Sequence, residues 1–470
     1  YTNDEFVDLC MGPHIPNTNV LKYFKLTKIS GAYWRGDDSN VQLQRIYGTS
    51  WFTKEDLNQY LIQQEEAEKR DHRKLGNELD LFASSEELGS GNFLWKPKGA
   101  VLRDVIESYS KKAHLQNGYS LVNTPHIGKS ILWETSGHLD HYSENMYPPI
   151  HHVENNETYY LKPMNCPFHI LVYKSDLHSY KELPLRYFEF GSVYRYEKTG
   201  VLHGLLRLRG FTQDDAHIFC TIEQINDEVK TLLSFSVNLL GSFGLTEIEA
   251  DLSTKPKKYI GSDKDWDNAT SSLKQSLTEL EVPFQTAEGE GAFYGPKIDL
   301  HAKDAIGRRW QLSTIQIDFA QPENFDIEYV NSNNKKSRPV MIHRALLGSV
   351  ERFTAVLLEH YAGNLPGWLS PTQVDILTIG DVNDYAVNIL NDLNSFRVNL
   401  DNKNIRLGEK LHNSEKSKTP IQIIIGEKDS SNYTMAINIF GKENMKDVNY
   451  KKAIITIKNS LKEPEFILNG

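Results

Sequence analysis

Polar side chains that could contact a ligand lie close together in residues 211–219, which read FTQDDAHIF. With the two-residue period of a strand, one face carries an aromatic ring, an amide, a carboxylate and an imidazole, from Phe211, Gln213, Asp215 and His217. This combination is unusual for a strand face that meets only solvent. We therefore interpret the face as part of a binding site.

A second strand is expected just upstream, in residues 186–197, and a basic loop joins the two. Alternation puts Glu189, Arg195 and Glu197 on one face and aromatic side chains on the other. The connecting 198–210 loop contains three glycines and the basic residues Lys198, His203, Arg207 and Arg209. Such a loop could close on phosphate groups, but charged tips are also common in ordinary hairpins. The residues themselves leave both interpretations open.

Residues 309–318 are expected to form a strand with three polar side chains. Alternation places Thr314 and Gln316 on one face and Gln311 on the other. A bulge would be needed for all three to meet one ligand.

Residues 343–363 are expected to form a helix in which Ala345, Gly348, Ser349 and Arg352 share one stripe. A stripe of small residues usually indicates close helix packing. The alternative is room for a flat group beneath the Arg352 guanidinium.

Two cysteine–histidine pairs invite a metal interpretation. Cys166 lies between two prolines with His169 three residues later, although a lone buried cysteine is the more frequent outcome. Cys10 and His14 supply only two ligands, and no companion pair lies nearby, so we expect a structural role for them.

The composition is that of a globular protein. With 470 residues, 39% hydrophobic and 24% charged, the chain has room for two to four domains. No apolar run is long enough for a membrane span, and no membrane partner is expected. Three cysteines are too few for a disulfide framework, which indicates a reducing compartment. The net charge of −10 argues against a nucleic-acid partner, unless a basic groove is local.

Taken together, these stretches resemble the threonyl-tRNA synthetases of class II over nearly the whole chain. Residues 186–220 are similar to motif 2, and RLRGFTQDDAHIFC is close to the threonyl version. A helix, strand and proline in residues 101–126 resemble motif 1, the dimer element, and residues 343–363 resemble motif 3. The shortened mitochondrial type of fungi is the most similar. The resemblance implies an α/β fold (an α+β catalytic domain), with an antiparallel sheet flanked by helices and a C-terminal α/β anticodon-binding domain.

The resemblance also implies domain boundaries. Residues 1–70 correspond to the C-terminal part of an editing domain and a linker, 71–367 to the catalytic domain and 368–470 to the anticodon-binding domain. The editing domain's histidine pair is absent, so we expect no hydrolytic site in residues 1–70. Residues 55–74 are strongly charged and are expected to form an exposed connecting helix.

The roles implied for individual residues fall into four sets. Zinc would be held by Cys166, His217 and His343. ATP would be bound by Arg195, Glu197, Arg207, Phe211, Gln311, Thr314 and Arg352. Threonine would be bound by Gln213, Asp215, Tyr294 and Gln316. Catalysis would involve Arg195, Arg352, Lys297 and His138, the last near the tRNA terminus.

The implied activity joins threonine to tRNA(Thr) through a threonyl-adenylate, with zinc in the protein and magnesium accompanying ATP. The implied protein is a homodimer of the mitochondrial matrix, with its targeting segment removed, and the cytoplasm is the alternative. Two other functions are a synthetase-like RNA-binding or regulatory protein and a class II synthetase for serine or proline. Retention of Arg195, Glu197 and Arg352 argues against the RNA-binding or regulatory protein. A measurement of zinc content would separate a seryl or prolyl synthetase from a threonyl one.

Overall fold

The computed structural model describes residues 1–7, 9–37, 39–152, 157–259, 262–292 and 294–466. The chain divides into two compact units, Tyr1–Lys69 and Arg70–Gly470. In the described residues, no helix combines the length and the apolar character needed to cross a membrane.

The first unit is a long hairpin followed by a helix. Strands β3 (Tyr23–Tyr33) and β4 (Gln42–Trp51) pair antiparallel, α1 (Lys54–Lys69) follows, and the short strands β1 (Thr2–Asn3) and β2 (Phe6–Val7) precede them. Helix α1 contains no buried residue, as its charged composition predicts.

An eight-stranded sheet forms the centre of the second unit. Its order is β15-β14-β16-β17-β20-β13-β12-β7, and all neighbours are antiparallel except the parallel pairs β14–β15 and β12–β7. The strand bounds are β7 Ser120–Leu121, β12 Leu185–Tyr194, β13 Gly210–Cys220, β14 Ile248–Ser253, β15 Phe284–Ala287, β16 Lys297–Lys303, β17 Arg309–Asp318 and β20 Val340–Ser349. The expected sheet is present, and it is mixed and mainly antiparallel.

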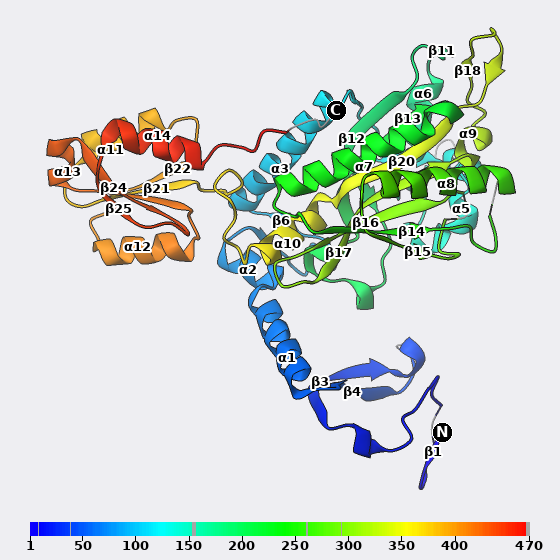
Figure 1. Cartoon of the computed structure of the whole chain (residues 1–470), viewed down its shortest axis with the longest axis horizontal. Helices are drawn as coiled ribbons and strands as arrows, with labels where there is room; N and C mark the ends of the chain where they lie inside the picture. Colours follow the sequence, from blue (N-terminus) through cyan, green and yellow to red (C-terminus); the bar gives the residue numbers. More distant parts are fainter. Residues whose placement is uncertain (8, 38, 153–156, 260–261, 293, 467–470) are drawn as a thin grey trace. The chain divides into compact units, whose positions relative to one another are not determined.

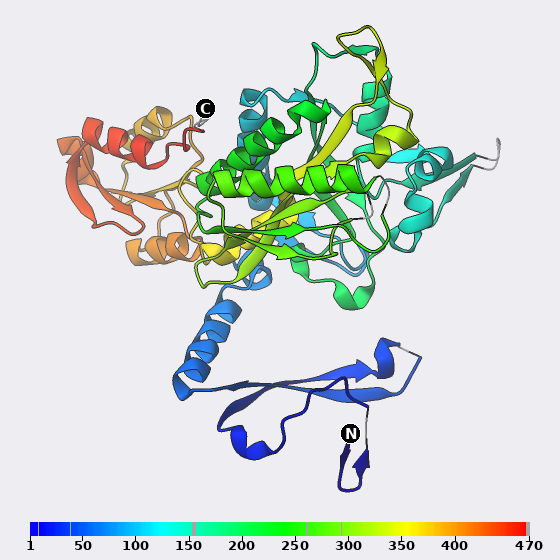
Figure 2. The ribbon, with the colours of Figure 1, turned by 45° about the vertical axis from the view of Figure 1, so that its right-hand side comes forward.

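Helices bury apolar stripes against this sheet. Helices α7 (Ile225–Ser242) and α8 (Asp263–Glu279) run side by side over one face (Figures 1 and 2). Leu233 and Leu273 from these helices belong to the same buried cluster as Ile315 of the sheet. Helices α3 (Pro97–Gln116) and α10 (Val350–His360) also contribute to this core.

The helix expected over residues 343–363 is wrong in its first third, residues 343–349. Strand β20 extends to Ser349, and α10 begins only at Val350. The run from 340 to 349 lies between β13 and β17 and forms backbone hydrogen bonds with both, so tertiary pairing overrides its helical spacing. Ser349 then caps α10, because its side chain accepts a hydrogen bond from the backbone N–H of Arg352.

Shorter elements complete the core unit. Their bounds are α2 His72–Glu78, β5 Phe82–Ala83, β6 Leu94–Trp95, β8 Ile127–Lys129, α4 Ser130–Thr135, α5 His138–His141, β9 Ile150–His152, β10 Glu157–Leu161, α6 Cys166–Lys174, β11 His178–Ser179, α9 Ala320–Asn324, β18 Tyr329–Val330 and β19 Lys336–Ser337.

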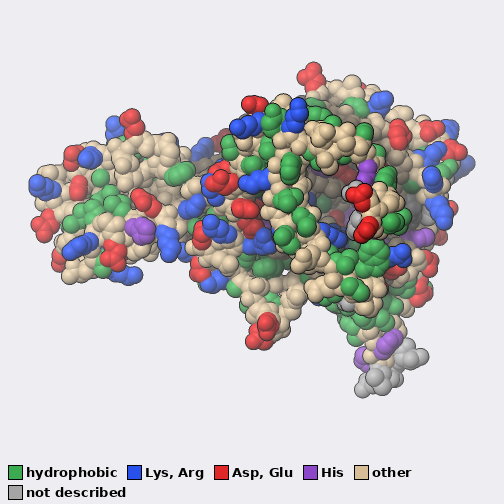
Figure 3. Space-filling model, turned by 90° about the horizontal axis from the view of Figure 1, so that it is seen from below, with side chains coloured by type: hydrophobic (Ala, Val, Ile, Leu, Met, Phe, Trp, Pro, Cys, Tyr) green, Lys and Arg blue, Asp and Glu red, His purple; other side chains and the backbone are tan. Residues whose placement is uncertain are grey.

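The C-terminal part is an α/β domain with its own core, as expected. Its five-stranded sheet has the order β22-β21-β23-β24-β25. The bounds are β21 Val374–Thr378, α11 Asn383–Asp392, β22 Val398–Asp401, α12 Leu407–Lys416, β23 Ile421–Ile425, α13 Glu427–Asn432, β24 Thr434–Ile439, β25 Met445–Asn449 and α14 Tyr450–Ser460. On the face seen in Figure 3, its basic side chains are interspersed with acidic ones.

Candidate active site

A cavity of about 510 Å³ opens beside strands β13, β17 and β20, and it gathers most of the residues singled out from the sequence. Its walls include Cys166, Arg195, Glu197, Arg207, Phe211, Gln213, Asp215, His217, Tyr294, Gln311, Thr314, Gln316, His343 and Arg352. These residues come from separate parts of the chain, so the sheet brings together what the sequence keeps apart.

The alternating face of β13 is confirmed as a cavity wall, since Phe211, Gln213, Asp215 and His217 all line it. Asp214 points away from this face and is fully buried. Its carboxylate accepts hydrogen bonds from backbone N–H groups of β20, including those of Leu346 (3.0 Å), Leu347 (2.9 Å) and Gly348 (3.1 Å). Asp214 therefore fixes the end of β20, and sequence reasoning missed this role.

The bulge required in β17 is present. Leu300 pairs with Ser313, but the next residue of β16, His301, pairs with Gln311. The extra residue shifts the alternation, and Gln311, Thr314 and Gln316 all reach the cavity.

Three side chains on the cavity wall could hold a metal ion. The ligand atoms of Cys166, His217 and His343 lie within 4.8 Å of one another. Cys166 begins α6, while His217 and His343 are directly paired across β13 and β20. One thiolate and two imidazoles suit zinc and leave a coordination position open.

With the three rings neutral, the hydrogen bonds around His217, His343 and His169 assign their tautomers. His343 Nε2 lies 2.8 Å from Asp318 Oδ2, and His169 Nε2 lies 3.2 Å from Glu189 Oε1. Carboxylates only accept, so both Nε2 atoms carry hydrogen. His169 Nδ1 is then an acceptor, and it receives the Nδ1 hydrogen of His217 at 2.8 Å. Both remaining nitrogens, His217 Nε2 and His343 Nδ1, present lone pairs toward the metal position.

The same hydrogen bonds show how His169 relates to the metal position. Its ring bonds to His217 and Glu189, and it is not among the residues that group around the metal position. His169, which the cysteine–histidine spacing suggested as a possible ligand, therefore supports the ligand His217 through a hydrogen bond. Burial raises the pKa of Cys166 and lowers the pKa of His217. A bound cation would lower the free-energy cost of ionising the Cys166 thiol, and the two histidines could donate their lone pairs to it.

Asp215 lies next to the metal position without joining the group. Its Oδ2 accepts a hydrogen bond from Asn165 Nδ2 at 2.9 Å, and its Oδ1 is 3.9 Å from His217 Nε2. Burial raises the pKa of Asp215. A cationic group of a ligand placed here would have a carboxylate to pair with.

The other end of the cavity is cationic. The Arg195 guanidinium lies 5.1 Å from the centre of the Phe211 ring, and within the described part of the chain neither Arg195 nor Arg352 forms an ion pair. Burial, with a contribution from Arg207, lowers the pKa of Arg352. Arg207 differs, because its guanidinium pairs with Glu197 at 2.9 Å. Two uncompensated guanidinium groups favour an anionic ligand such as a polyphosphate.

Two expected site residues do not line the main cavity. His138 lines a smaller adjoining pocket with Cys166, Tyr294 and His343. Its Nδ1 lies 2.7 Å from Ser136 Oγ, and burial lowers its pKa to about 4. Lys297 in β16 pairs with Asp299 Oδ2 at 2.6 Å.

Residues 1–70 contain no candidate metal centre among those described. Cys10 is exposed, and the ring of His14 stacks on Tyr1 with centroids 3.8 Å apart.

The comparisons with known proteins agree with this geometry. Residues 150–361 match the model of the tRNA synthetase class II core domain (G, H, P, S and T). Residues 1–47 match the threonyl and alanyl tRNA synthetase second additional domain, and residues 373–460 match an anticodon binding domain.

Curated relatives span nearly the whole chain. A threonine–tRNA ligase of Sulfurihydrogenibium sp. is 51% identical over 97% of this chain and 71% of its own length. One of Aquifex aeolicus is 50% identical over 99% and 73%, respectively. A crystal structure described as the RNA binding domain of threonyl-tRNA synthetase from Cryptosporidium parvum superposes with a TM-score of 0.78 and 37% identity, covering 84% of this chain and 99% of that one.

Proposed function

The chain belongs to the threonine–tRNA ligases, a family of class II aminoacyl-tRNA synthetases, and we propose that its cavity activates threonine with ATP and passes the threonyl group to tRNA(Thr). The observation that carries the proposal is the group of Cys166, His217 and His343 beside Asp215, whose ligand atoms lie within 4.8 Å of one another. We infer that this end of the cavity holds threonine and that the cationic end holds ATP.

The activation step needs no protein nucleophile. The threonine carboxylate attacks the α-phosphorus of ATP, the bond to the bridging oxygen breaks, and pyrophosphate leaves with its electron pair. Arg195 is placed to neutralise the charge that builds on the α-phosphate, and Arg352 to hold the outer phosphates. Magnesium accompanying ATP would share that charge.

The adenine and its neighbours have candidate partners on the same walls. Phe211 and Arg352 can enclose the ring, with Gln311 and Thr314 at its edge. Glu197 can accept from the adenine amino group while holding Arg207, since a carboxylate has several lone pairs.

Cys166, His217 and His343 would hold zinc, which supplies a Lewis acid for the amino and hydroxyl groups of threonine. Asp215 is placed to accept a hydrogen bond from the threonine amino group, and Gln213, Tyr294 and Gln316 line the remaining wall. Isosteric valine lacks the hydroxyl and would leave this polar wall unsatisfied. Serine keeps the hydroxyl and lacks only a methyl, worth roughly 1–3 kcal/mol, so it should be activated to a measurable extent.

Transfer to tRNA would use the pocket next to the cavity. His138 lies there as a neutral imidazole, placed to accept a proton from the terminal ribose hydroxyl. We assign no contact with the tRNA terminus to Lys297, because its ammonium group pairs with Asp299. We propose domain boundaries of 71–367 for the catalytic part and 368–470 for the part that binds the anticodon.

Two further proposals concern assembly and location. Exposed Leu115 and Leu121, in the segment similar to motif 1, support a homodimer, and sedimentation of the purified protein tests it. A role in mitochondrial translation rests on the likeness to the shortened fungal type. Imaging the tagged full-length protein tests that role, and a purely cytoplasmic signal would contradict it.

Aminoacylation tests the proposed function as a whole. Purified protein should attach radiolabelled threonine to tRNA(Thr) in the presence of ATP and magnesium, and Cys166→Ala should abolish this. Transfer of serine or proline to their own tRNAs instead would show a different class II specificity, and RNA binding without aminoacylation would favour a regulatory protein.

A further inference from the structure

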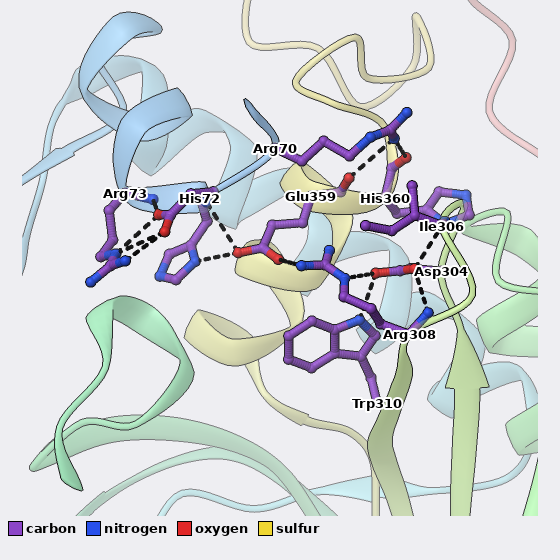
Figure 4. A network of polar contacts seen from close by, with 10 residues as sticks. Arg70, His72, Arg73, Asp304, Ile306, Arg308, Trp310, Glu359 and His360 are labelled. Carbon is purple, nitrogen blue, oxygen red and sulfur yellow. Dashed lines mark hydrogen bonds and ion pairs between the residues drawn. The ribbon is translucent and has the colours of Figure 1, made fainter. Parts of the chain in front are cut away.

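A fully buried histidine at the start of α2 forms hydrogen bonds with the 198–210 loop and with α10, two segments that line the cavity. His72 is 0% exposed, and Figure 4 shows its ring beside Glu359, near the end of α10. Its Nδ1 lies 2.7 Å from Glu359 Oε1, and its backbone N–H donates to the same oxygen at 3.1 Å. Its Nε2 lies 3.0 Å from the backbone nitrogen of Leu205 in the 198–210 loop.

These partners fix the ring as a neutral tautomer. The Glu359 carboxylate accepts only, so Nδ1 of His72 carries the hydrogen and Nε2 keeps its lone pair. That lone pair accepts the N–H of Leu205. A Cβ atom on Gly204 would overlap His72 Nε2, so the loop fits the ring only with glycine there, at a φ of +49°. The loop backbone is thus shaped against His72.

Glu359 extends the connection toward β17. Its Oε2 pairs with Arg308 Nη1 at 2.7 Å, and Arg308 Nε donates to Asp304 Oδ2 at 2.7 Å. Trp310 Nε1 donates to the same Asp304 oxygen at 2.9 Å, as Figure 4 shows. Trp310 directly precedes Gln311 of the cavity wall.

The network is therefore connected to three segments of the cavity wall. Leu205 to Leu208 of the loop, Gln311 of β17 and Arg352 of α10 all line it. His72 itself does not touch the cavity, so it can act only through these neighbours. Residues 199–209 form short 3-10 turns and one isolated bridge, between His203 and Arg207, and the N–H of Leu205 inside that bridge donates to His72.

A metal site is the other interpretation of this cluster, because Asp71, His72 and Glu359 bring ligand atoms close together. Both ring nitrogens of His72 are already used, and Asp71 is bound by Arg73 Nη2 at 2.6 Å. Arg308 already neutralises Glu359. The cluster is satisfied without a cation.

We propose that His72 is a positioning residue that holds the 198–210 loop in the conformation that binds ATP. The proposal rests on the assignment of the cationic end of the cavity to ATP. It attributes to His72 an effect on ATP binding and none on threonine binding.

Two substitutions separate the two hydrogen bonds of the ring. His72→Asn places an amide nitrogen close to the position of Nδ1 and keeps a donor for Glu359, but it cannot reach Leu205. His72→Gln extends an amide oxygen to the position of Nε2 and keeps an acceptor for Leu205. We expect His72→Asn to raise the Kd for ATP and the ATP KM in pyrophosphate exchange about 10-fold, with the threonine KM unchanged. His72→Gln should bring both ATP values to within about 3-fold of the wild type.

His178 supplies a matched control. It is also buried, and its ring nitrogens lie 2.9 Å from Glu182 and 2.9 Å from the Tyr173 carbonyl, away from the cavity. His178→Asn should lower thermal stability without changing ATP binding. Gly204→Ala provides an independent variant if His72→Asn does not fold, and it should weaken ATP binding through the overlap with His72.

The outcomes are distinct. Unchanged ATP affinity in His72→Asn, or in Gly204→Ala where His72→Asn does not fold, overturns the proposal. Equal losses in the Asn and Gln variants, with ATP and threonine KM rising together, would mean a purely structural role and also overturn it. Calorimetric titration with ATP alone measures the Kd for ATP in the absence of the reaction with threonine. A wild type that binds ATP but does not exchange pyrophosphate with threonine would contradict the proposed function instead.

Discussion

Nε2 of His217 lies 3.1 Å from Nδ1 of His343, and with the rings neutral their outer hydrogen bonds leave both nitrogens with lone pairs directed at one point. Two lone pairs this close repel each other unless a cation lies between them. The chain of partners behind each ring, His169 and Glu189 on one side and Asp318 on the other, prepares the ligands for a metal.

Disrupting that support should weaken metal binding without removing a ligand. His169→Phe deletes the acceptor of the His217 hydrogen, and we expect about a 10–100-fold loss of zinc affinity. His169→Asn keeps an acceptor near Nδ1 and should retain most of the affinity. Competition with a chromophoric chelator measures this, with the exposed His151→Phe as control. Equal affinity in His169→Phe and the wild type would show that the ring orientation is fixed by other contacts.

Arg195→Ala should slow adenylate formation far more than it weakens threonine binding. The guanidinium is unpaired by any described carboxylate, and in the proposed function it faces the developing phosphate charge, so we expect roughly a 10²–10³-fold loss of the exchange rate. Arg207→Ala is the matched control, because Arg207 is paired with Glu197 and should mainly affect the ATP KM. A change confined to the threonine KM would make Arg195 a ground-state ligand of the amino acid.

Asp214→Asn should loosen the end of β20. The carboxylate accepts from three successive backbone N–H groups, and an amide nitrogen in its place would face those donors. We expect a loss of about 1–3 kcal/mol of stability, measured by urea unfolding. Asp215→Asn, on the cavity face, should instead weaken threonine binding with a smaller effect on stability. Reversed effects in the two variants would mean that the two faces of β13 are misassigned.

His138 should make the protein less stable in mild acid. Its pKa is lowered by burial to about 4, against about 6.5 in an unfolded chain. The folded state therefore binds fewer protons in this window, and the stability present above pH 6.5 is lost as pH falls toward 4. Between pH 7 and 5 the loss amounts to about 2 kcal/mol. Urea unfolding at both pH values should show a smaller decline in His138→Gln than in the wild type, and an identical decline would mean that His138 is already accessible to protons.

The sequence predicted the parts of this site that follow local periodicity. Alternation was sufficient for Phe211, Gln213, Asp215 and His217, and the odd spacing of Gln311 correctly required a bulge. It failed where tertiary pairing decides, as in residues 343–349, whose helical spacing hides a strand between two neighbours.

His72 was missed for a related reason. It lies in a charged run that reads as an exposed helix, but α1 ends at Lys69, and Asp71 caps a second helix. The cap, followed by Leu75 and Leu79, was the available signal of a buried helix. The burial of His72 also depends on Glu359, far away in sequence, which no local pattern contains.

The most direct test of the central claim is ATP–pyrophosphate exchange by the purified zinc-loaded protein with threonine, serine and valine in parallel. We predict rapid exchange with threonine, measurable exchange with serine at roughly 10–200-fold lower efficiency, and negligible exchange with valine. Removal of zinc should abolish all three. Exchange with valine comparable to that with serine, or full threonine activity in metal-free protein, would contradict the assignment of Cys166, His217 and His343 as the centre that recognises threonine.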